Sequence, residues 1–245
     1  MRWCSCPRFQ APEPQGGLLS ETSLFSRQKS HWGPEKQQVL ARSSLLVAGV
    51  GGVGSMAAEL LVRCGIGKLV LVDNKVVDLP DLSRQALYNL DDLGQAKVQA
   101  AARRLGRLTG ATVLKPFRVT LGAPDPPEDL WDVDGCLDCL DNFRARFALE
   151  EHLVPAQFLV HGALRGNYGQ VTTLRPGQGV SLRALYRNLR QPTGMVPVAA
   201  PIVYALAVLM AQEAMHNLWG TPQLAGELLV VDLNHFLFQR QSLAP

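Results

Sequence analysis

A glycine-rich stretch between residues 44 and 73 constrains the fold of this chain more than any other feature. An apolar run, Leu45 to Ala48, leads into four closely spaced glycines, Gly49, Gly51, Gly52 and Gly54. A helical pattern of apolar residues follows, and a second apolar run ends on Asp73. This order of strand, glycine turn, helix, strand and acid predicts a nucleotide-binding βαβ unit.

The glycines have a physical role in such a turn. They adopt backbone angles that are closed to other residues, and they let the chain approach a phosphate with no Cβ in the way. The free N–H groups of the helix that begins near Ser55 then point at the anion. Asp73 ends the second strand, where a carboxylate can accept hydrogen bonds from ribose hydroxyls. The unit therefore predicts a nucleotide site without choosing the nucleotide.

Length and composition bound the remaining possibilities. The chain has 245 residues, enough for one α/β domain, which we expect over residues 21–245 after a flexible arm at residues 1–20. A net charge of +3 is too small to indicate binding to nucleic acid or to a membrane surface. The longest apolar stretch, Val196 to Met210, contains two prolines and is too short to span a bilayer.

Cysteine usage favours a reducing, cytoplasmic location. The five cysteines are scattered, and no signal peptide is visible. Cys136 and Cys139 have the spacing of a zinc or redox pair, but they lie in a strand predicted over residues 134–140, where residues three apart face opposite sides. No second pair is spaced to complete a tetrahedral site. We interpret both as ordinary thiols of a strand.

Several charged residues fall in segments expected at the carboxyl edge of the sheet, where open α/β folds bind ligands. Arg84 and Gln85 end a charged loop. Lys97 stands in or near the first turn of a helix predicted to about Leu108, a placement that makes more sense if an anion binds nearby. Asp141 can either cap the next helix or face a metal–phosphate centre, and the sequence leaves both open. Arg27, taken alone, is favoured as a solvated surface cation.

The remaining pattern predicts an α/β fold. The expected elements are strands at residues 113–119, 158–160 and 170–174, helices at 143–153 and 202–218, and a terminal hairpin from 228–231 and 236–238. A long Pro- and Gly-containing loop at residues 176–197 is expected to be functional or mobile.

Taken together, these segments resemble the ThiF/MoeB/HesA family, the bacterial relatives of the ubiquitin-activating enzymes. The resemblance runs from about Phe25 to Gln241 and follows the family's order of motifs. They are Phe25-Ser-Arg-Gln28, Gly49-Val-Gly-Gly-Val-Gly54, Cys64-Gly-Ile-Gly67, Leu82-Ser-Arg-Gln85, Gly94-Gln-Ala-Lys97 and Leu137-Asp-Cys-Leu-Asp-Asn142. The segment from His161-Gly-Ala to Gly169-Gln-Val and the apolar helix beginning at Pro201 complete the series. Several motifs at matching spacing are far more specific than a lone glycine fingerprint. The resemblance implies a Rossmann-like, doubly wound, mostly parallel sheet with antiparallel C-terminal strands.

The resemblance also implies an ATP-dependent adenylyltransferase acting on a ubiquitin-like sulfur-carrier protein, similar to ThiS or MoaD. The carrier's C-terminal glycine carboxylate attacks the α-phosphate of ATP, giving an acyl-adenylate and pyrophosphate. Arg84 and Lys97 then bind phosphates, Asp73 binds the ribose and Asp141 holds Mg²⁺. Arg27 becomes an arginine finger that reaches across a homodimer. The implied catalytic residues are Arg27, Arg84, Lys97 and Asp141, and the implied ATP-binding residues are Gly49, Gly51, Gly52, Gly54, Asp73, Arg84, Gln85, Lys97 and Asp141.

Three departures from the family's pattern qualify this expectation. Ser181-Leu-Arg-Ala184 stands where the first of two zinc-binding C-x-x-C pairs is expected, and no second pair follows, so we expect no zinc. Thr193 lies near the place of a cysteine that many relatives use for thioester or persulfide chemistry. Lys75 and Asp81 occupy positions where relatives commonly have Asp and Asn.

Three other interpretations remain. The chain is a catalytically altered or inactive member that acts as a binding module, or a tRNA threonylcarbamoyladenosine dehydratase from a related branch, or an NAD-binding oxidoreductase. The absence of a basic stripe argues against a tRNA substrate. Asp73 suits the ribose of NAD equally well, but no substrate domain is evident.

Overall fold

The structure is a computed structural model that describes residues 24–124, 126–189, 194 and 196–243. The arm predicted at residues 1–20 and the position of Thr193 lie outside these residues. The strands are β1 (Ser44–Ala48), β2 (Lys68–Val72), β3 (Val113–Phe117), β4 (Gly135–Asp138), β5 (Phe158–Arg165), β6 (Tyr168–Leu174), β7 (Glu227–Asp232) and β8 (Leu237–Ser242). The helices are α1 (Ser26–Trp32), α2 (Pro34–Arg42), α3 (Gly52–Cys64), α4 (Lys97–Gly106), α5 (Phe143–His152), α6 (Leu182–Leu185) and α7 (Ala200–Leu218).

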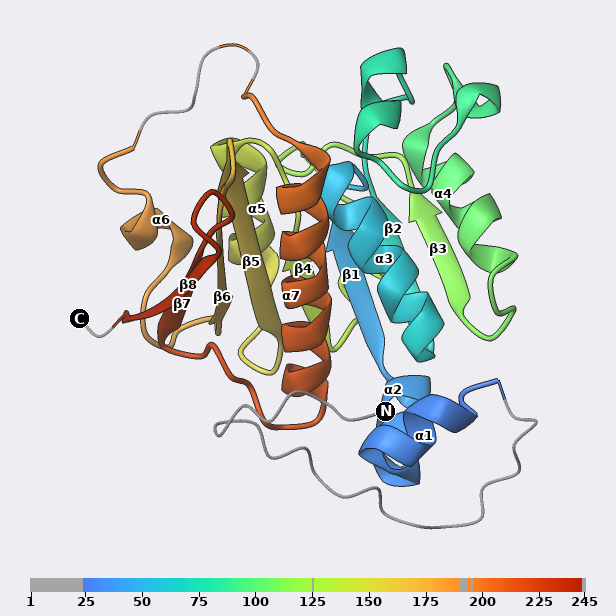
Figure 1. The fold of residues 1–245 in the computed structure, drawn as a ribbon, viewed down its shortest axis with the longest axis horizontal. Coiled ribbons are helices and arrows are strands. Elements are labelled where there is room, and N and C mark those ends of the chain that lie inside the picture. The colour runs from blue at the N-terminus through green and yellow to red at the C-terminus, as the bar shows by residue number, and fades with distance from the viewer. Residues whose placement is uncertain (1–23, 125, 190–193, 195, 244–245) are drawn as a thin grey trace.

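All of these strands belong to one sheet, in the order β3-β2-β1-β4-β5-β6-β7-β8 (Figure 1). The pairs from β3 to β5 are parallel, and those from β5 to β8 are antiparallel. The chain therefore winds outward from β1 in both directions, first to β2 and β3 and then to β4 and β5. This confirms the Rossmann-like, doubly wound, mostly parallel sheet with antiparallel C-terminal strands.

Apolar side chains form a core on each face of the sheet, so the central strand β1 is buried on both sides. Leu45 and Val47 pack with α3, α4 and α7 on one face, whereas Leu46 and Ala48 pack with α5 on the other. Alternate residues of a strand point to opposite faces, so a continuous apolar run such as this one fits a central strand covered by helices on both sides. Figure 1 shows α3 and α7 in front of the sheet and α5 behind it.

The βαβ unit matches its prediction closely, since its boundaries are set by local backbone chemistry. α3 ends where Gly65 adopts a left-handed φ of 84°, and the Gly65 N–H group bonds back to the carbonyls of Leu61 and Val62. Two short 3₁₀ helices, η1 (Leu79–Ser83) and η2 (Leu90–Asp92), lie in the segment between β2 and α4.

Several predicted elements differ in extent from the structure. The strand expected at residues 134–140 is only Gly135–Asp138, so Cys139 follows it. β5 was expected to end at Val160 but continues to Arg165, where it turns back and pairs with β6. His161 and Gly162 interrupt the apolar run, yet both belong to the strand. The loop predicted at residues 176–197 contains the short helix α6, whose start is capped by the Ser181 side chain, which accepts a hydrogen bond from the Ala184 N–H group at 3.2 Å.

The two N-terminal helices and the glycine turn lie at opposite ends of the parallel strands. Only Ser43 separates α2 from β1, so α1 and α2 lie at the amino edge of the parallel strands. The segments that leave the carboxyl ends of β1, β2 and β4 gather at the other edge, at the top of Figure 1. Within the described residues, no helix is long and apolar enough to cross a membrane.

Gly162 lets α7 approach the sheet closely, and this contact yields a first prediction. A Cβ at Gly162 would lie 2.1 Å from Sδ of Met210 on α7. We expect Gly162→Ala to lower the free energy of unfolding by roughly 1–3 kcal/mol, because overpacking forces the helix or the methionine to shift. The measurement is equilibrium unfolding in urea.

Gly106→Ala is the matched control. Its Cβ would lie 3.7 Å from the Leu114 Cδ1 atom, an ordinary contact, and Gly106 ends a helix without a left-handed φ. We expect this variant to be as stable as the parent or slightly more stable. Equal stability of both variants would contradict the close approach of α7.

Candidate functional site

The glycine turn between β1 and α3 forms the floor of the site. Gly49 has a left-handed φ of 85°, and a Cβ there would lie 2.8 Å from the Cys139 carbonyl oxygen. A Cβ at Gly54 would lie only 1.8 Å from the Gly49 carbonyl oxygen, so the turn tolerates no side chain at this position. Gly51 precedes α3 and no side chain caps the helix, which leaves its first N–H groups available to an anion.

Asp73 holds this turn in place from the end of β2. Its Oδ2 accepts a hydrogen bond from the Val50 N–H group at 2.9 Å, and its Oδ1 accepts one from the Lys75 N–H group at 2.8 Å. Each carboxylate oxygen can accept a further hydrogen bond. Asp73 therefore joins the glycine turn to the loop after β2 and still has acceptor capacity for a hydroxyl group.

A second group of charges surrounds Asp81, the N3 residue of the cap that begins η1. Its Oδ2 lies 2.9 Å from Nζ of Lys97, the first residue of α4, and its Oδ1 accepts a hydrogen bond from Nε2 of Gln85 at 2.6 Å. One Arg84 nitrogen lies 3.7 Å from the same Oδ1, and another donates to the Pro80 carbonyl at 2.9 Å. The Lys97 side chain is only 6% exposed.

The sequence led us to expect a bound anion near Lys97. In the structure the anion nearest to its ammonium group is a carboxylate of the chain itself, that of Asp81. In the sequence, Asp81 stands out only as a departure from the family's pattern. Neither periodicity nor spacing links residues 81 and 97, so their ion pair carries no sequence signal.

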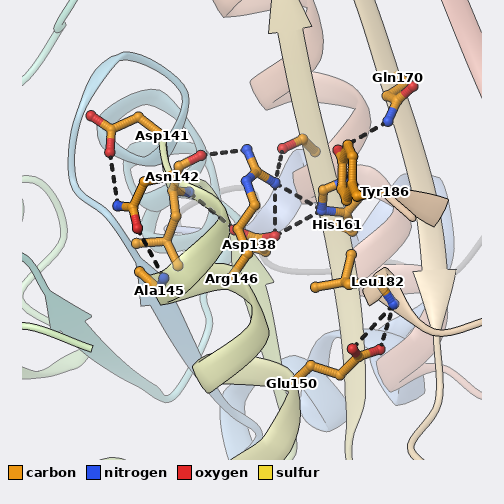
Figure 2. A network of polar contacts seen from close by, with 12 residues as sticks. Asp138, Asp141, Asn142, Ala145, Arg146, Glu150, His161, Gln170, Leu182 and Tyr186 are labelled. Carbon is orange, nitrogen blue, oxygen red and sulfur yellow. Dashed lines mark hydrogen bonds and ion pairs between the residues drawn. The ribbon is translucent and has the colours of Figure 1, made fainter. Parts of the chain in front are cut away.

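Asp141 follows β4, and the structure shows that it is not the N-cap of the next helix. Asn142 is the N-cap of α5, since its Oδ1 accepts a hydrogen bond from the Ala145 N–H group at 2.9 Å. Asp141 instead pairs with Lys75, whose Nζ lies 2.5 Å from Oδ2 (Figure 2 shows Asp141 beside Asn142). Burial by itself raises the pKa of Asp141, but the hydrogen bonds from Lys75 and Asn142 outweigh burial and hold this pKa below its usual value.

The structure brings together all the predicted site residues except Arg27. The glycines, Asp73, Arg84, Gln85, Lys97 and Asp141 all belong to segments at the carboxyl edge of the sheet. Arg27 is exposed on α1 at the opposite, amino edge (Figure 1). Within one chain Arg27 therefore lies far from the other cations of the site, because α1 is followed directly by α2, and α2 leads into the start of β1.

A buried polar network lies beneath this edge, and sequence analysis missed it (Figure 2). Asp138 of β4 and His161 of β5 are fully buried, with 2.7 Å between Asp138 Oδ2 and His161 Nδ1. Arg146 of α5 donates to Asp138 Oδ2 at 2.8 Å and to the Leu140 and Gly162 carbonyls. Charged residues inside an apolar strand need buried partners, so Asp138 could have been recognised as a member of a network.

The proton positions in this network follow from the charges. Asp138 is ionised: burial alone raises its pKa, but Arg146 and the hydrogen bonds from His161 and Leu140 lower it. Burial lowers the pKa of His161, which keeps the ring neutral. Nδ1–H then donates to the Asp138 carboxylate, which leaves Nε2 to accept from the Tyr186 hydroxyl at 2.7 Å. Gln170 donates to the Tyr186 oxygen at 3.1 Å.

The network also holds the segment around α6 against the sheet. Tyr186 follows α6 and inserts its hydroxyl between His161 and Gln170. Glu150 of α5 accepts hydrogen bonds from the Leu182 N–H group at 2.8 and 3.1 Å. Arg146 meanwhile bonds the Leu140 carbonyl, immediately before Asp141. The same buried residues therefore position both Asp141 and the beginning of the long segment before α7.

The charge pattern at the edge suits a polyphosphate. Three cations, Lys75, Arg84 and Lys97, stand near the uncapped start of α3, together with the carboxylates Asp73, Asp81 and Asp141. No group of three or more His, Cys, Asp or Glu side chains that could hold a metal occurs in the described part of the chain. Asp141 fits Mg²⁺, which binds proteins through one or two carboxylates together with substrate phosphates. Cys136 is buried and Cys139 is partly buried, and burial raises the pKa of both thiols.

Comparison with known proteins agrees with the resemblance seen in the sequence. Residues 25–245 match the ThiF family. The sulfur carrier protein adenylyltransferase of Thermus thermophilus is 33% identical over 221 residues, which cover 85% of this chain and 81% of that protein. The SAMP-activating enzyme E1 of Haloferax volcanii is 33% identical over 218 residues, covering 84% of this chain and 79% of that protein.

Two further comparisons extend the range of relatives. Adenylyltransferase and sulfurtransferase MOCS3 of Sus scrofa is 31% identical over 242 residues, covering 94% of this chain and 53% of that longer protein. Among solved structures, E. coli MccB with ATP superposes with a TM-score of 0.77 at 18% identity, covering 91% of this chain and 72% of that chain. At this level of identity the likeness shows the fold alone.

The neutral, buried His161 predicts how stability depends on pH. Burial holds its folded pKa below the unfolded value, so as pH falls below about 6.5 the unfolded chain binds a proton that the folded chain does not. We expect the free energy of unfolding to be at its full value above this pH and to fall by up to about 1.4 kcal/mol per pH unit below it.

Urea unfolding at several pH values checks this dependence. His161→Gln should be less stable at neutral pH, because it disrupts the network, but its stability should fall less between pH 7 and pH 5. His31→Gln, at an exposed position on α1, is the control and should keep the parent slope. An unchanged slope in His161→Gln would refute the assignment.

Proposed function

The chain belongs to the ThiF family, and we propose that it is an ATP-dependent adenylyltransferase that activates the C-terminal glycine carboxylate of a ubiquitin-like sulfur-carrier protein. The single observation that carries the proposal is the placement of Arg84 and Lys97 beside the glycine turn. The Arg84 side chain adjoins Gly52, and the Tyr88 hydroxyl contacts the carbonyl oxygens of both Val50 and Lys97. The chain is 33% identical to a sulfur carrier protein adenylyltransferase. A ubiquitin-like protein ending in glycine is thus the proposed partner.

The residues at the sheet edge have distinct proposed roles. The turn from Gly49 to Gly54 and the start of α3 bind phosphate oxygens through N–H groups. Arg84 and Lys97 stabilise the charge that develops while a carboxylate oxygen bonds to the α-phosphorus and pyrophosphate leaves. Asp73 accepts hydrogen bonds from the ribose, and Gln85 contributes to the same nucleotide site. Asp141 holds Mg²⁺, which neutralises charge on the phosphates when bound.

Preorganisation supports the roles of Lys97 and Arg84. Asp81 holds the Lys97 ammonium group in a nearly buried position, so little side-chain freedom is lost when a phosphate arrives. Arg84 is held by the Pro80 carbonyl. Groups that are already in place stabilise a transition state without the cost of reorganisation.

Arg27 requires a second copy of the chain if it is to act on this site. It is exposed at the far edge of the sheet, where a partner's site can meet it but its own cannot. We therefore propose a homodimer in which Arg27 of each subunit serves the other as an arginine finger. We also propose that residues 21–245 form one adenylation domain, that no zinc is bound, and that the protein is cytoplasmic.

A catalytically altered member that binds nucleotide with little turnover is the second candidate. The observation that favours it is the pairing of two proposed catalytic residues with side chains of the same chain, Lys97 with Asp81 and Asp141 with Lys75. A nucleotide must compete with both contacts. Nucleotide binding without any carrier-dependent chemistry would support this candidate.

Pyrophosphate exchange tests the main proposal. The full chain is incubated with ATP, Mg²⁺ and candidate carriers that end in Gly-Gly, and carrier-dependent exchange of labelled pyrophosphate into ATP is expected. Arg84→Ala and Lys97→Ala should each lower the exchange rate by about 10²-fold or more, because each removes a charge that stabilises the transition state. Arg63→Ala, at an exposed site on α3 far along the helix, is the control. No exchange with any carrier, while a known relative is active alongside, would refute the proposal.

Mixing inactive variants tests the role of Arg27 across the dimer. Arg27→Ala and Lys97→Ala are each expected to be inactive, but a mixed dimer contains one site with both residues intact. Co-expression should therefore restore about a quarter of the parent activity, since half of the dimers are mixed and each has one working site of two.

The control mixture combines Arg84→Ala with Lys97→Ala. Both residues belong to the same side of one site, so mixed dimers contain no intact site and activity should stay absent. Full activity of Arg27→Ala alone would contradict the finger, as would a failure to restore activity in mixed dimers verified by purification with two tags.

A further inference from the structure

Lys75 lies between the two carboxylates that the proposed function assigns to the ribose and to the metal. It follows Asp73 by two residues, and its Nζ reaches Asp141 Oδ2 at 2.5 Å. β1 lies between β2 and β4 in the sheet, so the ion pair spans two strand spacings, roughly 10 Å, across the carboxyl end of β1. The glycine turn begins at that same strand end.

The Lys75 backbone is fixed at both of its polar groups. Its N–H group donates to Asp73 Oδ1 at 2.8 Å, and its carbonyl oxygen accepts from the Lys97 N–H group at 3.1 Å. A bridge between Val76 and Ala96 continues this contact. The side chain of Lys75 is therefore directed into the site from a rigid position, between the end of β2 and the start of α4.

The ion pair between the two side chains, in contrast, is exposed to solvent. Those of Lys75 and Asp141 are 56% and 68% exposed, and exposed ion pairs hold weakly against competing ligands. A phosphate oxygen and a carboxylate oxygen are equivalent acceptors for an ammonium group. A divalent cation, for its part, outcompetes a single ammonium group for a carboxylate when phosphates complete its coordination.

From this geometry we propose that Lys75 is a nucleotide-binding residue that stands beside Asp141 in the place of a divalent cation. Without metal, the Lys75 ammonium group bridges Asp141 and a phosphate oxygen, so the protein binds ATP even in a chelator. When Asp141 holds Mg²⁺, Lys75 leaves the carboxylate, and its charge is no longer needed to hold the phosphate. The proposal rests on the proposed function, because it assumes that the site takes ATP.

As a consequence, the affinity of this site for ATP should depend less on a divalent metal than the affinity of a site that has the carboxylates but no Lys75. Asp73, Asp81 and Asp141 would repel a free triphosphate, and Lys75 is paired with Asp141 through its ammonium group and bonded to Asp73 through its backbone N–H group. Removing Lys75 should therefore harm metal-free binding much more than binding in the presence of Mg²⁺. Asp141 in turn should bind a divalent cation more tightly once its competitor is gone.

Calorimetric titration of ATP into the full chain, with no carrier present, tests the inference. The titration is carried out once in EDTA and once in excess Mg²⁺, and the parent protein should bind ATP under both conditions. Lys75→Met keeps the length of the side chain without its charge, and it should weaken binding in EDTA on the order of ten-fold or more while changing binding in Mg²⁺ by about three-fold at most. Lys115→Met, on β3 away from the site, is the matched control and should leave both affinities unchanged.

A second variant and a second readout separate a local effect from a general loss of structure. Asp141→Asn should bind ATP in EDTA at least as tightly as the parent, because the carboxylate that competes for Lys75 is gone, and Mg²⁺ should add little. Mn²⁺, followed by electron paramagnetic resonance in the presence of ATP, should bind Lys75→Met more tightly than the parent. Melting temperatures of both variants should stay close to that of the parent.

Three results would overturn the inference. Parent protein that binds ATP with Mg²⁺ but not in EDTA would refute the role of Lys75 and leave the proposed function standing. Equal binding of the parent and Lys75→Met in EDTA would do the same. If the parent protein bound ATP neither in EDTA nor in Mg²⁺, both the role of Lys75 and the proposed function would be refuted. Normal ATP binding without carrier-dependent exchange would count against the proposed activity alone.

Discussion

The site depends on the contact between Gly54 and the carbonyl oxygen of Gly49, which leaves no room for even one methyl group. This contact turns the chain from the buried strand β1 directly into α3, so that the uncapped start of the helix faces the carboxyl edge of the sheet. Asp73 then bonds to the turn and transmits its position to the loop after β2. Every other residue of the site is placed relative to this turn by the parallel pairing of β2, β1 and β4.

Charge balance is the second constraint at this edge. Each of its cations contacts a carboxylate of the same chain, most closely Lys97 with Asp81 and Lys75 with Asp141. The Lys97 pair is nearly buried and acts as a fixed support, whereas the Lys75 pair is exposed and can open. A polyphosphate therefore meets one rigid and one adaptable cation. This difference in burial, rather than the number of charges, gives the two lysines separate proposed roles.

Beneath the edge, one buried network links the site to the segment around α6. Arg146 contacts both Asp138 and the backbone just before Asp141, and His161 carries the same network on to Tyr186. Buried polar groups are costly unless every member is bonded, so the residues of this network must stay together. The position of Asp141 and that of the segment before α7 are therefore coupled through the interior of the protein.

The sequence by itself determined the βαβ unit, because its glycines and apolar runs are close together in the chain, where short-range backbone geometry decides the outcome. The resemblance of its motifs to the ThiF/MoeB/HesA family implied the doubly wound fold and almost every residue proposed for the site. Only the tertiary structure decided which charges meet. Lys75 and Asp141 are 66 positions apart, and no periodicity relates them until parallel strands bring their ends to one edge. The same strand order carries Arg27 to the opposite edge, because α2 leads directly into the start of β1.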